Sequence, residues 1–260
     1  MSGSGTAPAG GVRIVLKYTG RNHMEKECDS MAMGRRAVLL TGTVVATLWI
    51  LIILFLPARA AVLEHYQYVR EESGKQIPVK WLLEKEDGYT LNYHTSRIKA
   101  VTETDHDFAT LRWHCENAAE GTDIRAERQG NTIHLKGMLE GKSVDRVMRI
   151  DDSPWYQATT LSLRAFVLSA QERAEFWVLR PGSLKPYKLV ATKEWVENRD
   201  VLGTSVPVQK VKISPGGMLA ALWSCQYWFK KDDGMLIKCE TPTGPPGSPD
   251  VVIRLTGIVR

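Results

Sequence analysis

Aromatic side chains are the residues of this sequence whose types and spacing suggest a binding surface. Trp223, Cys225, Tyr227 and Phe229 alternate along one segment, which places them on one face if that segment is a strand. Aromatic walls with a few polar tips are typical of pockets for lipids and other hydrophobic ligands. We therefore predict a ligand-binding surface formed by Trp113, Trp177, Trp223, Tyr227 and Phe229. The alternative is that these rings fill a closed core, which is the commoner role of buried aromatic residues.

Two cysteines form a candidate disulfide. Cys225 and Cys239 lie in segments joined by a turn at Lys231 to Gly234, and counting outward from that turn brings them near one another. An exported domain would permit the bond. A pair of free thiols is the alternative, because the loop length sets whether the two residues are opposite each other.

Catalytic and metal-binding patterns are missing from the sequence. His114 and Cys115 are adjacent, so on a strand they point to opposite faces and cannot exchange a proton. The histidines lack the spacing of zinc motifs, and the chain has neither a phosphate-binding glycine loop nor a GxSxG elbow. We therefore expect no enzymatic activity, no catalytic residues, no metal and no cofactor.

The distribution of the net charge of +5 along the chain argues against a nucleic-acid partner. Residues 1–60 hold seven Lys or Arg and three Asp or Glu, which leaves 27 of the 34 bases and 26 of the 29 acids for the rest. A nucleic-acid groove needs clustered surplus Lys and Arg. The nearly neutral remainder does not supply one, so we expect no nucleic-acid partner.

A stretch at the front of the chain has the length and composition of a membrane segment. Residues 37–56 carry no charge, Arg35 and Arg36 precede them, and Pro57 follows. Ala58, Ala60 and Ala61 fit the small-residue pattern of a signal-peptidase cleavage site. The segment 37–60 is thus either a cleaved signal peptide or a retained anchor. Residues 1–36 are predicted to be a disordered cytoplasmic tail, or to precede the true start codon.

The remaining residues, 61–260, alternate apolar and polar side chains with the period of half-buried strands. Between residues 62 and 150 the turns at Asp87-Gly88, Gly130-Asn131 and Glu140-Gly141 predict a meander of about six or seven strands. A helix is predicted between Pro154 and Ala170, capped by Ser153. The fold class is therefore mainly β: a curved antiparallel sheet or open half-barrel with one short helix, preceded by the signal or transmembrane helix.

The second half of the chain resembles a known bacterial family. Its order of features is Asp151-Asp152, Leu163-Arg164, Phe176 to Leu179 before Pro181, Val206 to Ile213, Gly216-Gly217, Tyr227 to Phe229, Leu236 to Glu240, and GPPGSPDVVIRL. These features, over roughly residues 145–258, are similar to the family called domain of unknown function 3108. The resemblance implies an exported half-barrel akin to periplasmic lipoprotein carriers, with an apolar concave face and no established activity.

Two functions follow as expectations. The first is a non-enzymatic cell-envelope protein whose curved sheet binds a lipid, an acyl chain or another hydrophobic ligand. The alternative is a structural or interaction module with a closed core, tethered to the membrane through residues 37–56 and bound to another envelope protein. In both cases we expect the bacterial inner membrane with residues 61–260 in the periplasm, or release into the periplasm after cleavage.

Overall fold

The computed structural model describes residues 61–180, 182–217, 223–242 and 250–259. The chain divides into two units, Met1–Pro57 and Ala58–Arg260, and all described residues belong to the second. The predicted tail, the apolar segment 37–56 and the alanines Ala58 and Ala60 lie outside the described residues, whereas Ala61 begins the first strand. Within the described ranges, no helix is long and apolar enough to cross a membrane.

Eight antiparallel strands form the first half of this unit. They are β1 (Ala61–Glu72), β2 (Lys75–Glu86), β3 (Gly88–His94), β4 (Lys99–Thr104), β5 (Thr110–Asn117), β6 (Thr122–Gln129), β7 (Thr132–Leu139) and β8 (Lys142–Arg149). A 3-10 turn, η1 (Ala118–Glu120), joins β5 to β6. The three predicted turns connect β2 to β3, β6 to β7 and β7 to β8. The meander therefore has one or two strands more than the turn spacing predicts.

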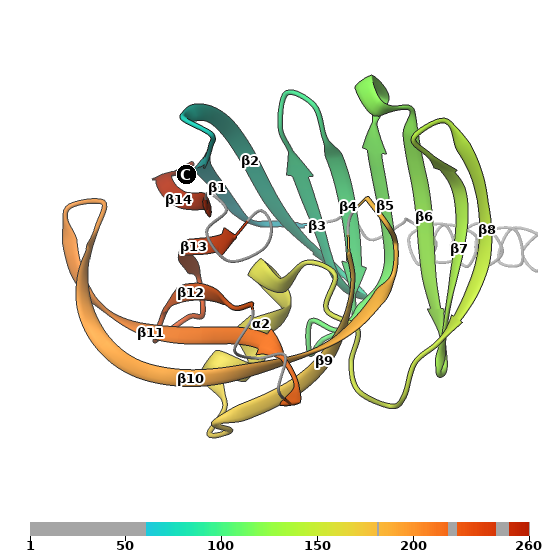
Figure 1. The fold of residues 1–260 in the computed structure, drawn as a ribbon. Helices are drawn as coiled ribbons and strands as arrows, with labels where there is room; N and C mark the ends of the chain where they lie inside the picture. The colour runs from blue at the N-terminus through green and yellow to red at the C-terminus, as the bar shows by residue number, and fades with distance from the viewer. Residues whose placement is uncertain (1–60, 181, 218–222, 243–249, 260) are drawn as a thin grey trace, which may run out of the picture. The chain divides into compact units, whose positions relative to one another are not determined.

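In the described residues of the second half there are one α-helix and six further strands. These are α2 (Thr159–Leu168), β9 (Arg173–Leu179), β10 (Pro186–Val201), β11 (Thr204–Pro215), β12 (Cys225–Lys230), β13 (Leu236–Pro242) and β14 (Asp250–Ile258). Because β1 pairs with β14, all strands join one sheet in the order β8-β7-β6-β5-β4-β3-β2-β1-β14-β13-β12-β11-β10-β9. The sheet is antiparallel, strongly curved and unclosed, as predicted (Figure 1).

Local irregularities accompany the curvature of the sheet. The register shifts within β1, β10 and β12, and such bulges bend a strand and increase its twist. Gly137 in β7 has φ +138, and a Cβ there would lie 2.0 Å from the carbonyl oxygen of Asp123. Only glycine therefore allows β6 and β7 to approach so closely at this point.

The predicted start of the helix is wrong. Residues 154–156 are extended, because the Trp177 amide donates to the Pro154 carbonyl and the Tyr156 amide donates to the Trp177 carbonyl, both at 2.8 Å. This pairing with β9 uses the backbone hydrogen-bonding groups that a helix starting at Pro154 would need for its first turn. The helix instead begins after Ala158, which has no side-chain cap, so Ser153 is not the N-cap.

Two hydrophobic clusters form the core. The first joins α2 to β1–β3 and β9–β13, and its largest fully buried side chains include Phe176 and Phe229. The second joins β5–β7 to Trp155 and to Leu179 at the end of β9. The β9 end of the sheet thus packs against β5–β7 of the other half, and α2 lies on the concave face (Figure 1).

Candidate functional site

The concave face, where a ligand was predicted, is occupied by helix α2. Leu161, Leu163, Phe166 and Val167 are all buried in the first cluster, whereas Leu168, the last residue of the helix, is 49% exposed. A helix that buries side chains around most of its circumference is typical of a core element. Hydrophobic ligands therefore cannot reach this face while α2 remains in place.

One arginine is buried in this apolar helix. The Arg164 side chain is 8% exposed and forms a bidentate ion pair with Glu64 of β1, at 2.9 and 3.0 Å. Its guanidinium also lies about 6 Å from the ring centres of Trp81 and Phe108. Arg164 thus attaches α2 to the first strand of the sheet at a site largely shielded from water.

The turn between β12 and β13 completes this attachment. The Gly234 carbonyl accepts a hydrogen bond from Arg164 Nε at 3.4 Å. Gly234 has φ +68, and a Cβ there would lie 2.5 Å from Arg164 Cγ. On β12 itself, the Tyr227 hydroxyl lies 3.0 Å from Thr159 Oγ1. Polar contacts therefore hold α2 near its start and its middle.

The five predicted aromatic residues do not form one wall. Trp113 and Trp177 belong to the second cluster, while Tyr227 and Phe229 are buried in the first, with Trp223 packed against it half-buried. Burial raises the pKa of Tyr227 well above its ordinary value. The structure thus divides these rings between two clusters, with Trp177 and Trp223 only half-buried, and the ones on β12 face α2.

Trp177 is fixed by a polar cluster at the sheet edge. Its indole Nε1 donates to Asp151 at 2.8 Å, and Lys188 contacts the same carboxylate and lies 6.0 Å from the Trp177 ring centre. Hydrogen bonds from Lys188 and Trp177 hold the pKa of Asp151 well below its ordinary range. This cluster joins the segment before α2 to β9 and β10.

The two candidate disulfide cysteines are free thiols in the structure. Cys239 pairs with Tyr227 rather than with Cys225 in the register of the hairpin, which shifts by one residue at Ile237 of β13. Cys225 and Cys239 are therefore diagonal neighbours, farther apart than residues directly opposite. Burial raises the pKa of Cys239 to about 12 and that of Cys225 even further, so both thiols stay protonated at neutral pH.

His114 and Cys115 point to different surroundings. The Nε2 atom of His114 lies 2.8 Å from Asp123 and 3.4 Å from Glu116. Cys115 packs against the second cluster, where burial raises its pKa to about 11. In the described part of the chain, no three His, Cys, Asp or Glu side chains are arranged to hold a metal ion.

Sequence reasoning missed two features. Arg164 and Glu64 were not singled out, although a charge within an apolar helix was a usable signal. Trp228 points away from α2 and is nevertheless only 4% exposed, because Arg199, Lys210 and Lys238 lie 4.8 to 5.4 Å from its ring centre. This stack of cations on an aromatic ring stabilises the convex face of β10–β13.

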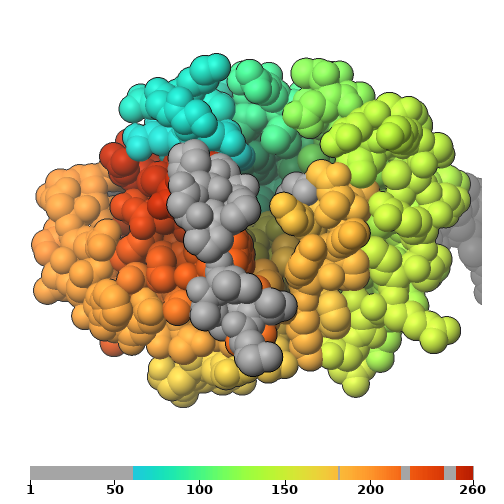
Figure 2. Space-filling view, viewed as in Figure 1, coloured from blue at the N-terminus to red at the C-terminus, as the bar shows by residue number. Residues whose placement is uncertain are grey.

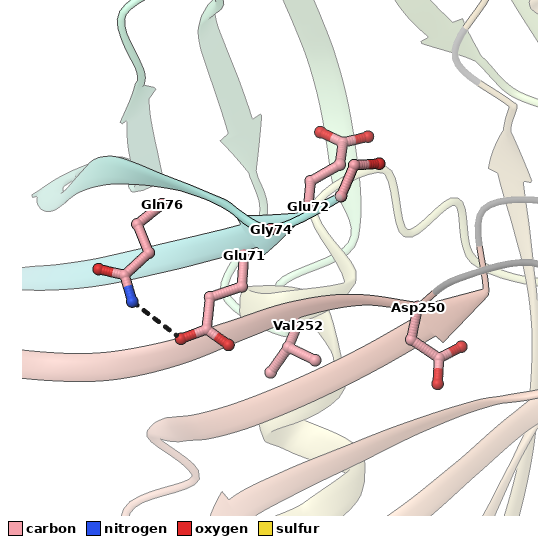
Figure 3. A pocket seen from close by; sticks show the side chains of 7 residues that line it. Glu71, Glu72, Gly74, Gln76, Asp250 and Val252 are labelled. Carbon is pink, nitrogen blue, oxygen red and sulfur yellow. Dashed lines mark hydrogen bonds between the residues drawn. The ribbon is translucent and has the colours of Figure 1, made fainter.

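The larger surface hollow is acidic. It measures about 400 Å³ and is lined by Glu71, Glu72, Ser73, Gly74, Gln76, Asp250 and Val252 (Figure 3). Gln76 donates to Glu71 at 3.5 Å, and Arg70 contacts Glu72 at 3.0 Å. Exposed carboxylates do not suit a hydrophobic ligand. A second cleft, of about 230 Å³, lies beside the tip of the β10–β11 hairpin.

Comparisons with known proteins show the fold but no family. No family model and no curated protein matches the chain, so the resemblance to domain of unknown function 3108 gains no support from them. A beta-barrel-like protein of domain of unknown function DUF1849 from Brucella abortus is similar in structure, with a TM-score of 0.52 and 10% identity over 75% of this chain and 95% of that chain. The hypothetical lipoprotein YmcC from Escherichia coli K12 has a TM-score of 0.38 and 10% identity, over 76% and 90% of the two chains. The first likeness establishes a barrel-like β fold shared with a bacterial protein.

Proposed function

We propose that this chain is a non-enzymatic bacterial envelope protein that binds a hydrophobic ligand, a lipid or an acyl chain, on the concave face of its sheet. The apolar segment 37–56 supports a place at the inner membrane, with the sheet in the periplasm or released there. A place in the family of domain of unknown function 3108 is part of the same proposal. The observation that carries the ligand proposal is the occupancy of an unclosed, apolar concave face by one short helix.

In this proposal the ligand takes the place of α2. Displacement of the helix would expose a continuous apolar surface that includes Trp81, Leu83 and Phe229. The ion pair between Arg164 and Glu64 must break for this to happen, and both groups then regain water. An acyl chain would replace the apolar contacts that Leu161, Leu163 and Phe166 make in the closed form.

The experiment is ligand recovery and uptake by the unit 58–260, which contains both core clusters. Protein purified from bacteria is extracted with organic solvent for lipid mass spectrometry and then titrated with a dansyl-labelled fatty acid. We expect a co-purified lipid and saturable uptake. Glu64→Gln should take up the probe more tightly, because it weakens the attachment of α2. Glu103→Gln is the matched control, since its ion pair with Arg112 is exposed.

The alternative function is a membrane-tethered structural or interaction module with a permanently closed core. The full burial of Trp155, Phe176 and Phe229 favours it, because such packing needs no ligand. An empty protein from every preparation, with no uptake by the wild type or by Glu64→Gln, would support this module and overturn the ligand proposal.

A further inference from the structure

The tip of the β10–β11 hairpin extends past its neighbours in the sheet. The strand pairing of β11 with β12 begins at Val208 and Lys230, and the Lys231 amide also donates to the Pro207 carbonyl at 3.0 Å, so among the described strands residues 196–206 pair only within the hairpin. The tip packs against β13 and β14, where Val201 joins the first cluster with Ile237 and Leu255 (Figures 1 and 2). The space between them is the hairpin cleft, lined by Arg199, Asp200, Val201, Leu202, Ile237, Lys238, Arg254 and Leu255.

The polar side of the hairpin cleft offers hydrogen-bond donors. Its lining contains Arg199, Lys238 and Arg254 but only one carboxylate, Asp200, which accepts the Gly203 amide at 3.2 Å. Each cation has a carboxylate partner outside the lining: Glu197, Glu240 and Glu71, respectively.

Within the described residues, these ion pairs use only part of the donors of the two arginines. Arg199 pairs through Nε at 2.7 Å, and Arg254 pairs through one terminal nitrogen at 3.1 Å. A guanidinium has five N–H donors in all. The cations are thus held in place by their partners while their remaining N–H groups can donate to an anion. Such a site recognises an anion by hydrogen bonds more than by uncompensated charge.

The apolar side of the cleft contains a strained residue. Leu202 has φ +52, a left-handed conformation that is rare for leucine and strained. Its side chain is 49% exposed at the lip of the cleft, although glycine or asparagine would suit this turn better. Ile237 and Leu255 form the apolar floor, each 7% exposed. Leu202 therefore offers an exposed apolar contact beside the N–H donors of the three cations, and this combination suits an amphiphile.

We infer that the hairpin cleft binds the anionic head of a single-chain amphiphile, with the carboxylate or phosphate on Arg199, Lys238 and Arg254. The first methylene groups would lie on Leu202, Ile237 and Leu255. The cleft is smaller than the roughly 300–1,000 Å³ of ordinary ligand pockets, so it takes the head and the start of the chain only. The inference deepens the proposed function, because it names the class of lipid and a second place of contact.

The test is photocrosslinking of the full chain in phosphatidylcholine nanodiscs with a diazirine-bearing dodecanoic acid. Labelled peptides are mapped by mass spectrometry, and dodecyl phosphate, dodecyl maltoside and inorganic phosphate serve as competitors. We expect labels at residues 199–202, 237–238 or 254–255, with strong competition by dodecyl phosphate only. The double variant Lys238→Ala/Arg254→Ala should lose about tenfold in cleft labelling, as expected for lost charged hydrogen bonds. Arg125→Ala, at an exposed arginine of β6, should label normally.

Leu202→Asn separates recognition from folding. Asparagine tolerates the left-handed turn, so thermal stability should stay the same or rise while cleft labelling falls. Labels confined to α2, β2 and β12 would overturn the cleft and leave the proposed function standing, whereas no labelling anywhere would count against both. Equal competition by dodecyl maltoside would refute recognition of the anionic head. Equal competition by inorganic phosphate would refute recognition of the chain.

Discussion

Replacing Glu64 by glutamine tests how strongly α2 is attached to the sheet. The substitution keeps the shape of the side chain but removes the charge opposite Arg164, whose side chain is 8% exposed. Removing one partner of a buried ion pair costs about 3–5 kcal/mol, because the other charge remains desolvated. The Glu64 side chain is 25% exposed, which places the expected loss near the lower end, about 3 kcal/mol.

Urea unfolding of residues 58–260, followed by tryptophan fluorescence and circular dichroism, measures this loss. With a slope of about 2–3 kcal/mol/M, the midpoint should fall by about 1–1.5 M. Glu103→Gln, which removes the exposed pair with Arg112, should change the free energy of unfolding by less than about 1 kcal/mol. Equal midpoints for the two variants would refute the view that Arg164 is a buried anchor of α2.

Three further predictions concern the turn at Gly234, the thiols and Asp151. Gly234→Ala should destabilise the protein more than Gly74→Ala in thermal unfolding, because both residues have positive φ but only Gly234 is in contact with Arg164; equal losses would contradict the contact. Thiol titration of denatured 58–260 without reductant should count three free thiols, and a count of one would reveal a disulfide among Cys115, Cys225 and Cys239. Asp151→Asn should destabilise the protein at pH 7. The pKa of Asp151 is lower in the folded than in the unfolded protein, where it is about 3.9, so the ionised carboxylate stabilises the fold above that pH. That difference in urea midpoint should shrink as the pH falls below this value towards the lowered pKa of the folded protein, and a difference that stays unchanged at low pH would contradict the role of the charge.

The strands could be predicted because the alternation of apolar and polar side chains is visible within each short segment. The buried face of β7 could be read from this alternation, since Ile133 and Leu135 are both buried. The start of the helix could not be predicted. Ser153 and Pro154 have the sequence of a helix N-terminus, but the backbone of Trp177 forms hydrogen bonds with Pro154 and Tyr156 instead. The local sequence shows which secondary structure a segment favours, but hydrogen bonds to distant segments can override that preference.

The candidate site was less predictable, because alternation shows which face a side chain takes but not what lies opposite that face. Trp113 and Trp177 come together since β9 packs over β5–β7, away from Tyr227. The register of the β12–β13 hairpin likewise places Cys239 opposite Tyr227, and nothing in the residue types around the turn marks Ile237 of β13 as an extra residue. Long-range packing and register shifts are the parts that a single sequence leaves undetermined.

The size of α2 sets a lower limit on the chain length of a ligand that can displace it. Leu161, Leu163, Phe166 and Val167 are buried, and at about 1.5–3 kcal/mol each they stabilise the closed form by about 6–12 kcal/mol. A methylene group contributes about 0.8 kcal/mol on burial, so an eight-carbon chain supplies about 6 kcal/mol and a sixteen-carbon chain about 12 kcal/mol. We therefore expect fluorescence titration of residues 58–260 to show binding of palmitate and little binding of octanoate.

The same arithmetic predicts how Glu64→Gln changes this limit. A loss of about 3 kcal/mol in the attachment of α2 equals about four methylene groups, so the shortest chain that binds should become about four carbons shorter. Glu103→Gln should leave the limit where it is in the wild type, because its ion pair does not touch the helix. If the limit is the same in Glu64→Gln as in the wild type, α2 is a permanent part of the core and the ligand does not replace it.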